Sequence, residues 1–163
     1  SALSLSEAAE NALWQVNYQA PIQLIKQVAE RNCKIRLVQL SSLAALCPHP
    51  YLAAYSASKA ALQTYCLALQ EELRLKGSEM RVCLYILGPV RTAIFPPELQ
   101  NALGGSQLQM SPEIAARRII GLLQQGRSYA IVGKRYRLLA WLMKLLPQRW
   151  IIRLIGAYLR KGL

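Results

Sequence analysis

Two short apolar segments, with a long run free of glycine and proline lying between them, limit most strongly how this chain can fold. Residues 35–40 and 81–86 are rich in β-forming side chains, and each runs into a polar or glycine-containing turn. Between them, residues 55–76 are rich in Ala, Leu and Glu and are followed by Gly77, as a long helix would be. Strands joined by a crossover helix pair in parallel, so this order predicts a parallel sheet covered by helices.

Later segments extend the same alternation. Ser111 and Pro112 are typical of a helix start, with the serine as cap and the proline in the first turn. This helix should end before Gly126, and a third strand is expected at 129–132. The connection of about twenty residues before Ser111 has the length of a lid or binding loop.

An earlier helix is expected from about Ala8 to Arg31, with Ser4 and Glu7 forming a capping box at its start. Pro21 lies in its middle and donates no backbone hydrogen bond. Its ring also clashes with the carbonyl four residues earlier, which belongs to Asn17. We therefore expect a kink that leaves this carbonyl free.

The net charge of +12 is concentrated at the end of the chain, where residues 134–163 hold eight Lys and Arg and no acidic residue. Residues 136–146 and 148–161 have the pattern of two helices interrupted at Pro147, and the second sets a basic stripe against a wide apolar face with Trp and Tyr. This pattern suits a helix lying in a membrane interface. It equally suits helices that cover a substrate pocket or a dimer partner. Nucleic acid is a less suitable partner, since no binding motif accompanies the charge.

The cysteines lack the Cys-x-x-Cys spacing of a metal or redox site, and His49 is the only histidine. We expect the cysteines to be small buried residues in a reducing compartment, and no metal site. Neither a secretory signal nor an uninterrupted apolar run of 18 residues is visible in the sequence.

Tyr55 and Lys59 are four residues apart on the long predicted helix, so their side chains project from one face. An ammonium group near a phenol favours the phenolate. Bringing a tyrosine from its reference pKa toward neutrality takes about three units, or roughly 4 kcal/mol, which a cation in a partly desolvated site can supply. The pair alone is weak support for chemistry, because this spacing is also common on solvated helices.

Ser42 closes the first predicted strand 13 residues before Tyr55, and this context changes the interpretation. The segment from Leu37-Val-Gln-Leu-Ser-Ser-Leu-Ala-Ala through Tyr55-Ser-Ala-Ser-Lys-Ala-Ala-Leu62 resembles the active-site signature of the short-chain dehydrogenase/reductase family. The resemblance covers about residues 5 to 95. Its further matches, in chain order, are Val16-Asn17, Gln70-Glu71-Glu72-Leu73 and Gly88-Pro89-Val90-Arg91-Thr92.

The resemblance implies a role for each matching residue. Tyr55 would be the general acid in carbonyl reduction and the general base in alcohol oxidation, and Lys59 would lower its pKa and hold the nicotinamide ribose. Ser42 would hydrogen-bond the substrate oxygen as charge develops on it. Asn17 would hold a water of the proton relay through its main-chain carbonyl. The nicotinamide carboxamide side would be lined by Gly88, Pro89, Val90 and Thr92. The family usually has Pro-Gly where this chain has Leu87-Gly88, which should soften that turn.

The glycine-rich turn with which the family binds the cofactor pyrophosphate is missing from this sequence. Only 54 residues precede Tyr55, too few for two further β-α-β units of about 30 residues each. We therefore expect an α/β fold that is a truncated Rossmann-type doubly wound sheet of about three parallel strands, with one exposed edge. Residues 1–133 would form the catalytic part and 134–163 a basic amphipathic helical tail. A start at Ser1 in place of Met also suggests a fragment.

These features predict an NAD(P)-dependent oxidoreductase that interconverts a carbonyl and a secondary alcohol, with this chain inactive alone. NAD or NADP would be the cofactor, with NADPH slightly preferred, although the residues that select between them belong to the missing half. We expect a small hydrophobic substrate, a homodimer of the full-length protein, and a cytoplasmic location with peripheral membrane contact through 134–163. The alternative is a non-catalytic interaction or membrane-surface module of the same lineage.

Overall fold

The computed structural model describes residues 2–31, 33–94 and 109–160, and its centre is a parallel sheet. Three strands, β1 (Arg36–Ser42), β2 (Arg81–Leu87) and β3 (Tyr129–Val132), lie in the order β1-β2-β3. Arg36 pairs with Arg81, and Leu84 pairs with Tyr129. The predicted α/β fold with three parallel strands is confirmed.

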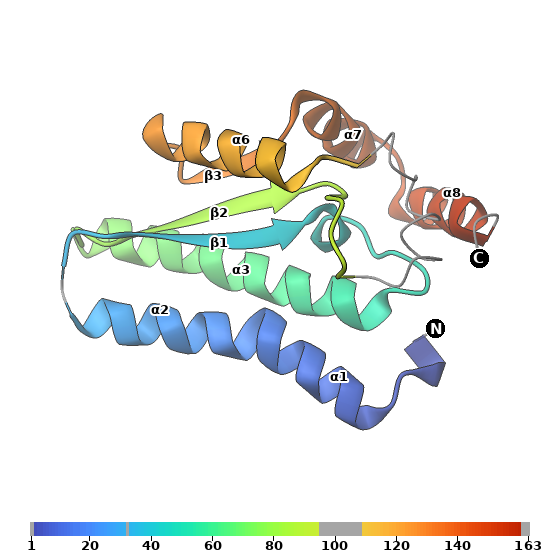
Figure 1. The fold of residues 1–163 in the computed structure, drawn as a ribbon, viewed down its shortest axis with the longest axis horizontal. Helices are drawn as coiled ribbons and strands as arrows, with labels where there is room; N and C mark the ends of the chain where they lie inside the picture. Colours follow the sequence, from blue (N-terminus) through green and yellow to red (C-terminus); the bar gives the residue numbers. More distant parts are fainter. Residues whose placement is uncertain (1, 32, 95–108, 161–163) are drawn as a thin grey trace.

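The middle strand β2 separates two hydrophobic cores. Val82 and Leu84 pack with residues of the helices on one face, chiefly those of α3 (Ala53–Leu75). Cys83 and Tyr85 point to the other face, toward α6 (Pro112–Gln124). Figure 1 shows α3 and the first helices below the sheet and α6 above it. A strand covered on both faces is expected to be apolar throughout, and residues 82–86 of β2 are all buried.

The first helix contains a wide turn in place of a simple kink. The α-helix α1 (Glu7–Trp14) continues through a π-helical turn, Gln15–Gln19, into α2 (Ala20–Glu30). In this turn the N–H of Ala20 donates to the carbonyl of Gln15, five residues back. The turn ends two residues before Pro21, whose ring would clash with the Asn17 carbonyl in an undistorted α-helix.

The predicted cap of this helix was wrong by two residues. Residues Ala2–Ser4 form a short 3-10 turn, so α1 starts later than Ser4 would allow. The cap is Ser6, whose hydroxyl accepts a hydrogen bond from the N–H of Ala9 at 3.3 Å.

The predicted cap at Ser111 and the predicted helix ends before Gly77 and Gly126 are confirmed, whereas α3 begins two residues before the predicted start at Tyr55. The Ser111 hydroxyl accepts from the N–H of Ile114 at 3.3 Å at the start of α6. Gly77 and Gly126 follow α3 and α6 in the left-handed region, with φ of 63° and 71°, where a residue with a Cβ would be strained. The predicted lid or binding loop lies largely outside the described residues.

Helices α7 (Lys134–Leu145) and α8 (Gln148–Arg160) lie beyond the carboxyl ends of the strands, toward which the arrowheads of β1 and β2 point in Figure 1. Pro147 separates them, as predicted. Tyr136 and Ala140 of α7 belong to the core on the α6 face of the sheet. In the described part of the chain, no helix has the length and apolar content needed to cross a bilayer.

The cysteines differ in part from the prediction. Cys47, Cys66 and Cys83 are buried, and burial raises the pKa of the Cys66 thiol to about 12. Cys33 is exposed, because it lies in the connection between α2 and β1 and not on a packed face.

Candidate active site

The predicted site residues meet at the carboxyl ends of β1 and β2. Ser42 is the last residue of β1, and Tyr55 and Lys59 lie in the first two turns of α3. The segment 88–92 follows β2 directly. The structure brings these residues together in the wall of one cavity of about 1060 Å³. Those that line it are Ser42, Tyr55, Lys59, Gly88, Pro89, Val90 and Thr92, whereas Asn17 does not.

Tyr55 and Ser42 interact directly. Burial raises the pKa of the Tyr55 phenol above its ordinary value, and a hydrogen bond with the Ser42 hydroxyl lowers it in part. The Ser42 hydroxyl also accepts from the N–H of Ala44 at 3.2 Å, which holds the serine at the end of the strand. The two hydroxyl groups therefore lie within reach of a single substrate atom.

Lys59 is tied to the end of β1. Its ammonium Nζ donates to the main-chain carbonyl of Leu40 at 3.2 Å and lies 5.9 Å from the centre of the Tyr55 ring. Burial lowers the pKa of Lys59. The raised pKa of Tyr55 is opposite to the lowering that was expected from Lys59, because the phenol is desolvated and the ammonium group bonds to Leu40.

Asn17 acts on the site through its side chain. Its amide Nδ2 donates to the hydroxyl of Ser58 at 3.2 Å, and that hydroxyl donates to the main-chain carbonyl of Tyr55 at 2.8 Å. Ser58 is fully buried. Asn17 therefore fixes the π-helical turn against the helix that carries Tyr55 and Lys59, while the role of its own carbonyl stays a prediction.

Ser58 was missed by the sequence interpretation. A serine inside a helix often bonds back to the carbonyl three or four residues earlier, so its place three residues after Tyr55 was an available signal. Its bond with Asn17 was not predictable, since the two residues are 41 positions apart in the chain.

Tyr136 of α7 shapes the turn after β2 and was also missed. A Cβ atom at Gly88 would overlap the Tyr136 ring, so only glycine fits there without movement. The Tyr136 hydroxyl donates to the Pro89 carbonyl at 3.4 Å, and the N–H of Met110 donates to the same carbonyl at 2.9 Å. These contacts hold the turn in which Leu87-Gly88 replaces the family's usual Pro-Gly.

The rest of the cavity wall is mostly apolar and comes from α6, α7 and α8. His49 also lines the cavity, and burial lowers the pKa of its imidazole, which favours the neutral ring. The sequence leaves open whether the tail covers a substrate pocket or a dimer partner, or lies on a membrane, and the structure places tail side chains in the wall of this cavity. Those side chains are Arg135, Tyr136, Leu139, Leu142, Met143, Leu146, Ile151, Leu154, Ile155, Tyr158 and Leu159.

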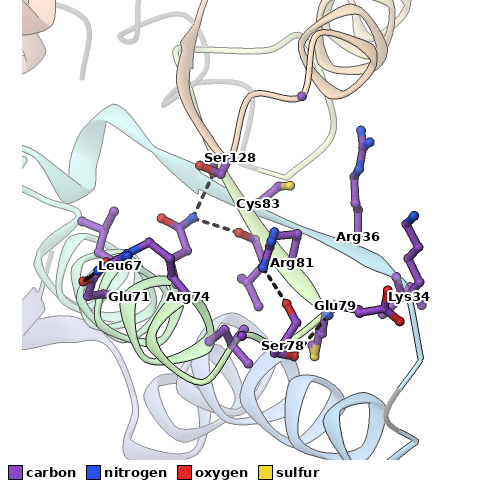
Figure 2. Close-up of a pocket in the computed structure, with 17 residues that line it drawn as sticks. Lys34, Arg36, Leu67, Glu71, Arg74, Ser78, Glu79, Arg81, Cys83 and Ser128 are labelled. Atoms are coloured by element: carbon purple, nitrogen blue, oxygen red, sulfur yellow. Dashed lines mark hydrogen bonds and ion pairs between the residues drawn. The ribbon is translucent and has the colours of Figure 1, made fainter.

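A second cavity, of about 1000 Å³, lies at the opposite end of the sheet and holds none of the predicted site residues. Figure 2 shows its wall, where Arg81 donates to the Ser78 carbonyl at 2.7 Å and Arg74 pairs with Glu71 at 2.6 Å. The Gln70 amide donates to the carbonyls of Val82 and Ser128, each at 2.9 Å. The bonds of Gln70 join α3 to the amino ends of β2 and β3, which is a structural role. The pair of Arg74 and Glu71 lies within α3 and is exposed.

Comparison with known proteins agrees with this arrangement. The family model described as short chain dehydrogenase matches residues 1–102. Short-chain dehydrogenase ptmH from Penicillium ochrochloron is 28% identical in sequence, over 83% of this chain and 57% of its own length.

Solved structures give the same result. A short chain dehydrogenase from Burkholderia cenocepacia J2315, in complex with NADP, has a TM-score of 0.71 at 21% identity, over 91% of this chain and 60% of that one. A 4-hydroxyisoleucine dehydrogenase, complexed with NADH and succinate, has a TM-score of 0.66 at 25% identity, over 80% of this chain and 60% of that one. The chain thus spans less than two thirds of the length of these relatives. With the family model matching more than half of its residues, the chain belongs to the short-chain dehydrogenase family.

Proposed function

We propose that this chain carries the catalytic centre of an NAD(P)-dependent oxidoreductase that interconverts a carbonyl and a secondary alcohol. The observation that carries the proposal is the hydrogen-bonded pair of Ser42 and Tyr55 in the wall of the cavity. Two hydroxyl groups in contact can both donate to one substrate oxygen, and such donors stabilise the negative charge that develops there. Lys59 lies beside them and supplies the nearby positive charge.

Tyr55 is the proton donor and acceptor in this proposal. Burial raises the pKa of its phenol, so the group is protonated at neutral pH and ready to donate to a carbonyl oxygen. In the oxidation direction it must accept the proton of the alcohol. The positive charge of Lys59 would stabilise the phenolate when it forms. The phenolate would in turn favour the charged lysine, against the lowering of the Lys59 pKa by burial.

The residues around the cavity fit the nicotinamide end of a cofactor. Lys59 offers a donor for the ribose hydroxyls, and Gly88 adds no side chain of its own to the cavity wall. When bound, the cofactor donates or accepts the hydride. Asn17 and Ser58 position α3, and they do not contact the cavity themselves.

The pyrophosphate and adenosine of the cofactor need residues that this sequence does not provide, because its glycines form no phosphate-binding turn. We infer that this chain is the catalytic portion of a longer enzyme and is inactive alone. The neighbours bound to NADP and NADH support a nicotinamide for the family. A slight preference for NADPH stays a prediction, which initial rates with both cofactors would check.

The substrate we propose is a small hydrophobic carbonyl compound or alcohol. Most of the side chains that line the cavity are apolar, including Leu139, Leu142 and Ile155 from the two C-terminal helices. A wall of this kind binds apolar groups, while Ser42 and Tyr55 orient the single reacting oxygen.

Replacing Tyr55 by Phe tests the proposal in the longer protein that contains this chain. The Tyr55→Phe variant should lose turnover by about two to four orders of magnitude, since it lacks the group that transfers the proton. Cofactor affinity, measured by fluorescence titration with NADPH, should remain unchanged. Tyr51→Phe is the matched control, because Tyr51 is exposed and does not line the cavity. Equal turnover in the two variants would exclude Tyr55 as the acid and base.

A further inference from the structure

Positive charge is distributed very unevenly along the chain. Residues 1–113 contain nine Lys and Arg against eight Glu, whereas residues 114–163 contain eleven Lys and Arg and no acidic residue. The second stretch therefore carries nearly all of the net charge of +12. Most of these residues belong to α7 and α8 or flank them.

Helix α7 exposes an apolar stripe on the side opposite its buried one. Tyr136 and Ala140 face the core, being 5% and 2% exposed. Half a turn away, at spacings of three and four, lie side chains that are 43–61% exposed. They are Leu138, Trp141, Leu142 and Leu145. A surface helix usually has polar residues on this side, and here only Arg137 and Lys144 flank the stripe.

Helix α8 has the same organisation. Ile151 and Leu159 are buried, while an apolar stripe at intervals of four residues is 50–64% exposed. This stripe consists of Trp150, Leu154 and Tyr158. Helical spacing places a basic stripe beside it, made of Arg149, Arg153 and Arg160, all exposed.

We name these exposed side chains of α7 and α8 the tail surface. Its apolar members are Leu138, Trp141, Leu142, Leu145, Trp150, Leu154 and Tyr158, and its basic members are Arg137, Lys144, Arg149, Arg153 and Arg160. Of the apolar members, Leu142, Leu154 and Tyr158 also border the catalytic cavity, and the other four do not. Figure 1 shows both helices at the same end of the molecule, with α8 at its outer margin.

We propose that the tail surface docks on an anionic lipid bilayer. Exposed Trp and Tyr beside Leu are the side chains that enter the boundary between headgroups and acyl chains, and the arginines match the negative charge of the lipid headgroups. Because the apolar stripes run along the length of α7 and α8, both helices would lie along the membrane surface.

Other occupants fit the same surface less well. A second copy would bring two surfaces of the same charge together without an acidic residue to pair with. Nucleic acid would engage the arginines and leave the apolar stripes exposed. The residues changed in the test below stand apart from the proposed oxidoreductase chemistry, because neither the two tryptophans nor the basic residues of α8 line the catalytic cavity.

The test is flotation of the longer protein with vesicles of phosphatidylcholine alone and of phosphatidylcholine mixed with phosphatidylserine. We expect binding to the mixed vesicles only, weakened by salt. The double variant Arg149→Gln/Arg153→Gln should reduce partitioning about 25-fold, or about fivefold for each charge removed. Trp141→Ser/Trp150→Ser should also reduce it, and should do so at high salt as well as at low salt.

The matched control is Lys26→Gln/Lys76→Gln, which removes two exposed charges elsewhere and should leave partitioning unchanged. Circular dichroism checks that each variant is folded, and turnover of a water-soluble substrate should be the same in Arg149→Gln/Arg153→Gln as in the unmodified protein. Absence of binding to the mixed vesicles, or equal loss in the control, would overturn the proposal. Two further results would overturn it when vesicle binding stays the same. One is that the tryptophan variant converts a dimer to a monomer, and the other is that the arginine variant loses DNA binding.

Discussion

The phenol of Tyr55 is subject to two opposing influences from its surroundings. Burial raises its pKa and the Ser42 hydroxyl lowers it, while Lys59 is held by the carbonyl of Leu40. Ser42 thus affects both the charge on the substrate oxygen and the ionisation of the group that exchanges a proton with it. The two effects can be separated by their dependence on pH.

Replacing Ser42 by Ala removes the influence that lowers the Tyr55 pKa, so this pKa should rise further. Alcohol oxidation needs the phenolate, so its rate falls on the acidic side of a plot of kcat/KM against pH, and this acidic limb should therefore move to higher pH. The pH-independent rate should also fall, by about two to three orders of magnitude, for loss of one donor to the reacting oxygen. A profile that keeps its midpoint, or moves to lower pH, would contradict this role of Ser42.

At the scale of the elements, α3 is positioned by contacts along two sides. β1 holds it through Ser41, whose hydroxyl donates to the Lys59 carbonyl at 3.3 Å, and through the bond from Lys59 to Leu40. The π-helical turn holds it through Asn17 and Ser58. Two independent anchors keep the first turns of α3 in place relative to the cavity.

A double-mutant cycle measures the second anchor. Asn17→Ala and Ser58→Ala should each lower the free energy of unfolding by about 1 kcal/mol, because each removes one partner of a hydrogen bond in a buried setting. The double variant should cost less than the sum of the two, since both substitutions break the same bond. Urea unfolding of the longer protein gives these values, and full additivity would mean that the contact contributes nothing to stability.

The elements were predictable where the signal was local. The strands, the cap at Ser111 and the glycines after α3 and α6 were found because each depends on a few neighbouring residues. The cap predicted at Ser4 was wrong because Ser4 belongs to the 3-10 turn Ala2–Ser4, which leaves Ser6 to cap α1. The proline effect was located correctly, but a widened turn and a kink relieve the same clash, and the sequence does not distinguish them.

The residues of the site that belong to the family's sequence motif were predictable. Ser42, Tyr55, Lys59 and the segment after β2 meet in one cavity, although their roles stay predictions. Tyr136 was missed because its contact with Gly88 joins positions that are far apart in the chain and belong to different elements. No periodicity within α7 marks a residue that fills the space beside a particular glycine.

For the whole molecule, Gly88 and Tyr136 form the contact that links the C-terminal helices to the turn after β2. Gly88→Ala should destabilise the protein and raise the KM for the nicotinamide cofactor, since the new methyl group overlaps the Tyr136 ring and displaces the turn. Adding Tyr136→Leu should recover part of the thermal stability by making room for the methyl group. Thermal unfolding and initial rates measure both effects.

Gly121→Ala is the control for this substitution. Gly121 lies inside α6 with no atom within 4 Å of an added Cβ, so alanine should stabilise the protein, by about 0.5–1 kcal/mol. If Gly88→Ala were as harmless as Gly121→Ala, the turn would be free to move away from the ring.

The same contact restricts how this sequence can diverge. A larger residue at position 88 should be tolerated better once the ring at position 136 has been replaced, so we expect the order of the two substitutions to matter. Exchange of α7 and α8 with those of a relative is restricted in the same way. The transferred segment would bring its own residue 136 next to Gly88, whose surroundings here fit the Tyr136 ring. The two positions should therefore be inherited as a pair.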